Sequence, residues 1–148
     1  PIMTKEIKTE ILIHSAPEKV WKILTNFEDY PHWNPFIKFI KAELKVGNKI
    51  TARIEPPESN GMTFKPKILK CETNTELTWL GHFLLKGLFD GEHTFRLVDN
   101  ENGTTTFQQN ETFKGLLVPL FEKQLDNNTK RGFQEMNKKL KKLAEQCS

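Results

Sequence analysis

Residues 116–143, LLVPLFEKQLDNNTKRGFQEMNKKLKKL, repeat an apolar side chain every three to four positions. This spacing predicts one amphipathic helix of about 28 residues, or about 40 Å at 1.5 Å per residue. Charged side chains surround the apolar stripe, so the stripe must pack on another part of the chain. The stripe consists of Leu117, Phe121, Leu125, Asn128, Gly132, Met136, Leu140 and Leu143, with Phe133 beside it.

The chain before this helix alternates apolar and polar side chains, which predicts a sheet as the partner of the stripe. Residues 5–14 form the first alternating segment, and about six more follow between residues 36 and 113. Turn sequences such as Asn102-Gly103 join them as hairpins, which makes the sheet antiparallel. Pro66 lacks an amide hydrogen and is expected at an edge or a bulge. The economical arrangement folds the sheet around the helix.

Two short segments separate the first strand from the others. SAPEKVWKILTNF, residues 15–27, predicts a short amphipathic helix with Ser15 as its N-cap. EDYPHWNPF, residues 28–36, contains two prolines that prevent one smooth helix through it. Its three aromatic side chains are too many for an ordinary solvated loop, so this kinked connection is expected to bury apolar surface.

Composition and charge exclude several classes of protein. The 148 residues are expected to form a single domain, residues 1–148, and a net charge of +3 is far below the clustered excess of a nucleic-acid-binding protein. No apolar run is long enough to span a membrane, and the first residues lack a signal-peptide pattern. Cys71 and Cys147 are expected to be free thiols in a reducing compartment, which favours the cytoplasm.

Common motifs for metals and nucleotides are missing from the sequence. The four histidines form no H-x-x-x-H pattern, and no G-x-S-x-G, P-loop or G-x-G-x-x-G sequence occurs. We therefore expect neither a metal site nor a cofactor. The lysine-rich end of the helix, NKKLKKL, could meet acidic lipid, but lysines there also complement the helix dipole, and a solvated face is the interpretation adopted.

Polar or small residues interrupt the apolar face of the predicted sheet and helix. An unpartnered buried polar group costs about 1–3 kcal/mol, so a packed core would avoid them. Either they border a cavity and bind the polar head of a ligand or water, or they hydrogen-bond one another. The obvious pair is His93 with Glu111, in which His93 could also act as a general base. The set consists of Gly81, His93, Gln109, Glu111, Asn128 and Gly132.

Several segments resemble the polyketide cyclase/dehydrase-like branch of the START superfamily, the SRPBCC families. The resemblance covers about residues 5–145, and its segments are SAPEKVWKILTNFEDYPHWNPF, FKPKI, LTWLG, GLFDGEHTFRL and ETFKGLLVPL. It implies an α+β helix-grip fold, in which a seven-stranded antiparallel sheet, with two short helices after the first strand, curls around a long C-terminal helix. It also implies that the kinked aromatic segment closes one end of the grip, with Trp33 and Phe36 buried as a packing plug.

The resemblance further implies a deep, largely apolar cavity between sheet and helix. Relatives bind lipids, sterols, quinones, polyketides or plant hormones, and a minority are aromatase/cyclase enzymes. The segment GHFLLKGLFDG, residues 81–91, would then either cover the mouth of the cavity as a lid or pad the core as a plain hairpin.

Three functions remain open on this basis. The first is binding of a hydrophobic small molecule, such as a lipid, a quinone or a polyketide-like compound, without nucleic acid or stable membrane insertion. The second is a cyclase or dehydratase that moves protons with His93 or Glu111, and the third is a partner-binding module with a collapsed cavity. We expect binding rather than catalysis, and the oligomeric state is left open. The expected ligand contacts are Phe64, Ile68, Trp79, Gly81, His93, Phe95, Phe107, Gln109, Glu111, Leu117, Phe121 and Asn128.

Overall fold

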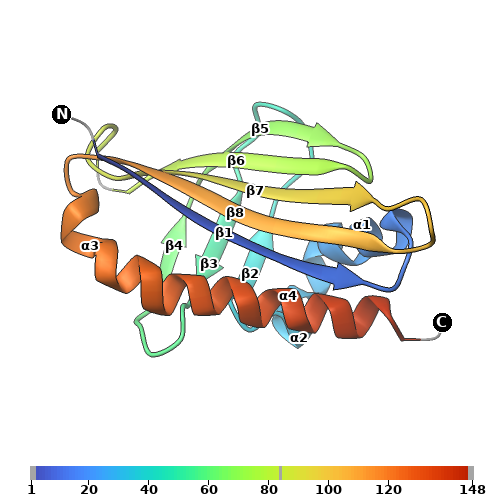
Figure 1. Cartoon of the computed structure of the whole chain (residues 1–148). Helices are drawn as coiled ribbons and strands as arrows, with labels where there is room; N and C mark the ends of the chain where they lie inside the picture. The colour runs from blue at the N-terminus through green and yellow to red at the C-terminus, as the bar shows by residue number, and fades with distance from the viewer. Residues whose placement is uncertain (1–2, 84, 147–148) are drawn as a thin grey trace.

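A curved antiparallel sheet wraps one side of a long C-terminal helix (Figure 1). The computed structural model describes residues 3–83 and 85–146. Two sheets are present in this part of the chain. The larger has the order β1 (Met3–Ile13), β8 (Thr105–Gly115), β7 (Asp90–Asp99), β6 (Glu76–His82), β5 (Lys67–Glu72), and the smaller has the order β2 (Ile37–Lys41), β3 (Thr51–Ile54), β4 (Met62–Phe64).

The helix-grip fold is confirmed, but the strands divide five and three instead of forming one seven-stranded sheet. Pro66 is the physical reason, because it lies between β4 and β5 and, without an amide hydrogen to donate, breaks the continuous strand that these two segments would otherwise form. The two sheets still join beside it. The Ile50 amide donates to the Pro66 carbonyl at 2.8 Å, and the Ile68 amide donates to the Asn48 carbonyl at 2.9 Å.

The C-terminal helix is continuous but not uniform. It consists of α3 (Val118–Gln124), a π-helical turn (Leu125–Thr129) and α4 (Lys130–Ala144). The wider turn adds a residue between the two α-helical parts, so the predicted stripe with a constant period is wrong. Asn128 is half-buried, whereas Asn137, which lay outside the predicted stripe, is buried. No helix of residues 3–83 and 85–146 is long and apolar enough to cross a lipid bilayer.

The kinked segment after β1 forms two short helices, α1 (Pro17–Thr25) and α2 (Tyr30–Trp33), with a 3-10 turn (Phe27–Asp29) between them. Ala16, not Ser15, is the N-cap of α1, and it has no side-chain oxygen to cap the helix, while Pro17 in the first turn has no amide hydrogen that needs a partner.

Tyr30 and Phe36 are the fully buried part of the plug in this segment, and the prediction that Trp33 is mostly buried is confirmed, although part of its side chain stays exposed. Tyr30 is fully buried, its hydroxyl donates to the Leu24 carbonyl, and burial raises its pKa above the ordinary value. Trp33 packs against the core and meets the Tyr30 ring at 5.2 Å between centroids. Because Tyr30 and Asn34 take the inward face of this turn, Trp33 lies at its edge.

The prediction of free thiols is confirmed for one of the two cysteines, Cys71. Cys71 lies on β5 and makes no disulfide, and burial raises the pKa of its thiol. Cys147 lies outside the described residues.

Gly132 of α4 allows the plug and the helix to touch. The Phe36 ring packs edge-on against Phe133 at 5.3 Å between centroids, and a Cβ atom added at Gly132 would overlap the Phe36 ring. The absence of a side chain at Gly132 therefore sets how closely the plug approaches α4.

Gly132→Ala is expected to destabilise the fold although alanine is the better helix former. The overlap with Phe36 costs about 1–3 kcal/mol, against a helix-propensity gain of about 1 kcal/mol. Urea unfolding of wild type, Gly132→Ala, Phe36→Ala and the double variant measures this. In the Phe36→Ala background, Gly132→Ala should no longer destabilise. Equal effects of Gly132→Ala in both backgrounds would show that the contact does not limit packing.

Candidate functional site

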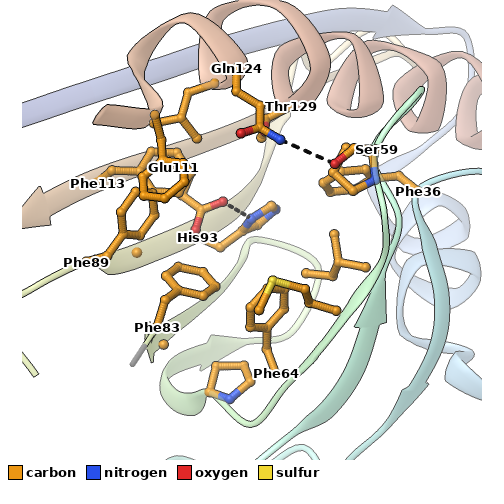
Figure 2. A pocket seen from close by; sticks show the side chains of 18 of the residues that line it. Phe36, Ser59, Phe64, Phe83, Phe89, His93, Glu111, Phe113, Gln124 and Thr129 are labelled. Atoms are coloured by element: carbon orange, nitrogen blue, oxygen red, sulfur yellow. Dashed lines mark hydrogen bonds and ion pairs between the residues drawn. The ribbon is translucent and has the colours of Figure 1, made fainter. Parts of the chain in front are cut away.

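A cavity of about 320 Å³ lies between the sheet and the C-terminal helix, near α3 and the π-helical turn. Figure 2 shows aromatic side chains from several separate elements converging on it. They give the cavity a mostly apolar wall, with ring faces and edges instead of flexible aliphatic chains. The aromatic lining residues are Phe36, Phe64, Trp79, Phe83, Phe89, Phe113 and Phe121.

Polar side chains lie on the solvent side of the cavity, where the 55–61 loop approaches the helix. Gln124 donates from its side-chain amide to the Ser59 hydroxyl at 3.4 Å (Figure 2). Beside it, the Arg131 guanidinium pairs with Glu58 at 3.1 Å. Since Gln124 is exposed and both Ser59 and Gln124 line the cavity, this polar edge is its mouth.

Two ionisable side chains are buried at the inner end of the cavity. His93 of β7 and Glu111 of β8 are directly opposite in the strand register, and the His93 Nδ1 lies 2.9 Å from Glu111 Oε1. His93 is 1% exposed and Glu111 is 9% exposed. The Trp79 indole stacks on the imidazole at 5.1 Å between centroids with an angle of 21°, which holds the plane of the ring. The predicted His93–Glu111 pair is confirmed.

A chain of hydrogen bonds behind His93 determines which imidazole nitrogen carries hydrogen. The Thr9 hydroxyl donates to the Gln109 carbonyl at 2.7 Å, so it accepts from the Asn137 side-chain amide at 2.9 Å. The Asn137 oxygen then accepts from the Gln109 side-chain amide at 2.8 Å. The Gln109 side-chain oxygen is left facing His93 Nε2 at 3.0 Å, and since that oxygen can only accept, Nε2 is the donor.

This polarity leaves the Nδ1 side of His93 for Glu111. With Nε2 protonated, a single further proton lies between Nδ1 and Glu111 Oε1, carried by either partner. The other carboxyl oxygen, Oε2, has no hydrogen-bond partner within residues 3–83 and 85–146. Oε2 lies against Gly91, where a Cβ atom would overlap it. Gly91 therefore makes room for a carboxyl oxygen that borders the cavity.

Half of the residues predicted as ligand contacts line this cavity. Those that line it come from β4, β6, β7, β8 and α3. They are Phe64, Trp79, Gly81, His93, Glu111 and Phe121.

The other predicted contacts lie outside the lining. Ile68, Phe95 and Phe107 are fully buried in the core. Gln109 lies behind His93 in the hydrogen-bond chain, and Leu117 uses its amide to bind the Leu88 carbonyl at 2.9 Å. Thr129 lines the cavity and Asn128 does not, because the π-helical turn changes which side chains of the helix face the cavity.

Several lining residues were not predicted as ligand contacts. Phe113 continues the alternation of Gln109 and Glu111 along β8, so the period of two could have identified it. Phe83 and Phe89 belong to the apolar segment 81–91, within which Leu84 lies outside the described residues. Whether this segment opens as a lid stays a prediction. Ser59, at the mouth of the cavity, lies in a loop, and the loop has no periodic pattern that would indicate which of its side chains face a cavity.

A metal centre finds no support in this geometry. Within residues 3–83 and 85–146, no group of three histidine, cysteine, aspartate or glutamate side chains could hold a metal ion.

The sequence matches a family model over residues 4–145, described as polyketide cyclase / dehydrase and lipid transport. The chain belongs to this family. No curated protein matches it in sequence.

Several proteins with solved structures share the fold at low sequence identity. The di-domain ARO/CYC BexL from the BE-7585A biosynthetic pathway superposes with a TM-score of 0.79 at 10% identity, covering 98% of this chain and 51% of that one, so this chain spans about half of it. Norcoclaurine synthase from Thalictrum flavum gives 0.73 at 14% identity, covering 97% and 96%. The Zhui aromatase/cyclase from Streptomyces sp. R1128 gives 0.74 at 11% identity, covering 97% and 94%.

The hydrogen-bond chain predicts the tautomer of His93. In the wild type, long-range ¹H–¹⁵N spectra at neutral pH should show His93 protonated at Nε2. Gln109→Leu removes the acceptor that faces Nε2, so the variant should show a mixture of Nδ1- and Nε2-protonated His93. Gln108→Leu, on the opposite face of β8, is the control and should match the wild type. A wild-type spectrum with a bare Nε2 would contradict the assigned polarity.

Proposed function

We propose that this protein binds a largely apolar small molecule with one polar group, held in the cavity between sheet and helix. The observation that carries the proposal is the cavity itself: aromatic walls surround about 320 Å³, and a buried His93–Glu111 pair lies at the inner end. Pockets for small molecules typically have volumes from about 300 Å³ upward and apolar walls with few polar groups.

The arrangement of polarity indicates how the ligand lies. The apolar body would contact the aromatic rings, because burying that surface supplies most of the binding energy. Its polar group would reach Glu111 Oε2, which has room to accept or donate one hydrogen bond. A hydroxyl, phenol or carbonyl group fits this site, since it can satisfy a single carboxyl oxygen without bringing another charge.

The comparisons support a ligand of this general class. The family model is described as polyketide cyclase / dehydrase and lipid transport, and several structural relatives are aromatase/cyclases. A collapsed cavity, as a pure partner-binding module would have, is not supported by the open space beside Glu111.

Proton transfer is the second candidate, and the His93–Glu111 pair favours it. The hydrogen-bond chain holds Nε2 as a donor, so the mobile proton of the pair lies next to Glu111. Glu111 Oε2 could pass a proton to or from a bound carbonyl compound, with His93 receiving or returning it at Nδ1. Such a step is needed whenever a polyketide-like chain enolises or loses water.

Filling the cavity tests binding. Gly81 lines the cavity, and a Cβ atom there meets Pro66 only at an ordinary 3.5 Å, so Gly81→Leu should fold and occupy the space, while Gly81→Ala is the matched control. Fluorescence titration with N-phenyl-1-naphthylamine, an uncharged apolar probe, should show stoichiometric binding by wild type and Gly81→Ala, and affinity at least about tenfold weaker in Gly81→Leu. Equal affinity in all three would place the probe elsewhere and refute the proposal. Native mass spectrometry of protein from its own host would then identify the ligand.

Deuterium exchange tests the proton-transfer candidate. With benzoylacetone as the probe, wild type should accelerate exchange at the carbon between the two carbonyls, and Glu111→Gln should lose about 10²–10⁴-fold of that acceleration. Gln108→Leu, outside the cavity, should exchange like wild type. Binding of the probe without any acceleration leaves the protein a binder and rejects the enzyme.

A further inference from the structure

One end of the molecule exposes large apolar side chains, most of which do not line the cavity. We call this group the apolar tip. It consists of Leu85 (71% exposed), Leu116 (63%), Leu120 (76%) and Phe121 (41%). Exposed apolar residues that occur singly need no explanation, but a contiguous group indicates an interaction surface.

Backbone hydrogen bonds hold the two segments of the apolar tip together. The Leu116 amide donates to the Gly87 carbonyl at 3.3 Å, which pins the loop between β6 and β7 against the start of α3. Leu116 lies in the turn just before α3 and Leu120 in the first turn of α3, so both exposed leucines project from the start of this helix. Figure 1 shows that loop and the start of α3 at the same end of the sheet.

Lysines surround the apolar tip. Lys86 lies beside Leu85, Lys114 precedes the turn into α3, and Lys123 is one turn beyond Leu120. All three are exposed, and none has an acidic group within 4 Å in the described part of the chain.

The acidic side chains nearby already have partners. Glu122 and Asp126 pair with Lys5 at 3.8 Å and 2.8 Å. Asp90 pairs with His82 at 2.7 Å and accepts a hydrogen bond from the Gly87 amide. The rim of the apolar tip is therefore positive, and its partner should be negative.

We propose that the apolar tip docks on the surface of an anionic lipid bilayer. The leucines would enter the boundary between headgroups and acyl chains, and Lys86, Lys114 and Lys123 would meet lipid phosphates. This is peripheral binding, and it needs no membrane-spanning helix. The leucines project singly from a loop and a helix start, which suits a fluid surface that needs no matching groove.

A second copy of the chain fits the apolar tip less well. In a two-fold dimer the same surface meets itself, so the three lysines of each copy would face one another without free acidic partners. A bilayer with anionic headgroups satisfies both the charge and the apolar surface.

Docking would bring one end of the cavity to the lipid. Phe121 belongs to the apolar tip and also lines the cavity, where its ring meets Phe89 at 5.2 Å between centroids. Docking through the apolar tip requires no ligand in the cavity, so this proposal can be tested independently of the proposed ligand binding.

Co-sedimentation with vesicles tests the proposal, using phosphatidylcholine with and without phosphatidylglycerol. Wild type should partition onto the anionic vesicles. Leu116→Ser/Leu120→Ser should lower the partition coefficient at least about tenfold. Neutralising Lys86, Lys114 and Lys123 to Gln should lower it about fivefold per lysine, and added salt should do the same. Phe39→Ser/Val46→Ser, at exposed apolar sites on other elements, is the matched control and should bind like wild type.

Other outcomes would overturn docking on lipid. Absence of sedimentation with anionic vesicles refutes it, as does an equal loss in the Phe39→Ser/Val46→Ser control. A concentration-dependent dimer that Leu116→Ser/Leu120→Ser abolishes, with no vesicle binding by wild type, would assign the apolar tip to a second copy. Gly81→Leu should keep vesicle binding even when its cavity is filled, which separates this proposal from ligand binding. Melting curves of every variant exclude misfolding as the cause.

Discussion

The need to satisfy buried polar groups links the whole of this fold to its site. One chain of hydrogen bonds starts at Thr9 on β1, passes through Asn137 on α4 and Gln109 on β8, and ends at the His93–Glu111 pair beside the cavity. An unmade bond in such a chain costs about 1–3 kcal/mol, so the first strand and the last helix must dock in one register. The same bonds orient the imidazole. Assembly of the core and preparation of the site are thus one event.

Two glycines set the dimensions around this chain. Gly132 lets the Phe36 ring approach α4, and Gly91 lets the Glu111 carboxyl turn toward the cavity. Each works by the absence of a Cβ atom in front of a specific neighbour. The plug therefore borders the cavity on one side and the Glu111 carboxyl on another. Both borders depend on glycines, Gly132 and Gly91, which have no side chain to contact a ligand.

Much of this architecture is predictable because alternation and helical spacing report which side chains are buried. The period of two places His93 and Glu111 on one face, and their pairing follows from hairpin register. Ligand contacts were less predictable. Periodicity shows that Phe95, Phe107 and Ile68 point inward, but it cannot show that they lie in the packed core while Phe64 and Trp79 border a cavity. The partial exposure of Trp33 was not predictable, because the inward side of a four-residue helix cannot be deduced from so short a segment.

The π-helical turn at Leu125–Thr129 has a consequence for how such a pocket can diversify. One residue corresponds to about 100° of rotation in an α-helix, so deleting a single residue from this turn would rotate α3 relative to α4 by about that angle. Phe121 and Gln124 would leave the cavity together and neighbouring side chains would replace them, while the α4 face that holds Asn137 stayed in place. Insertion or loss of one codon would thus exchange one wall of the pocket while the core contacts of α4 stayed in place.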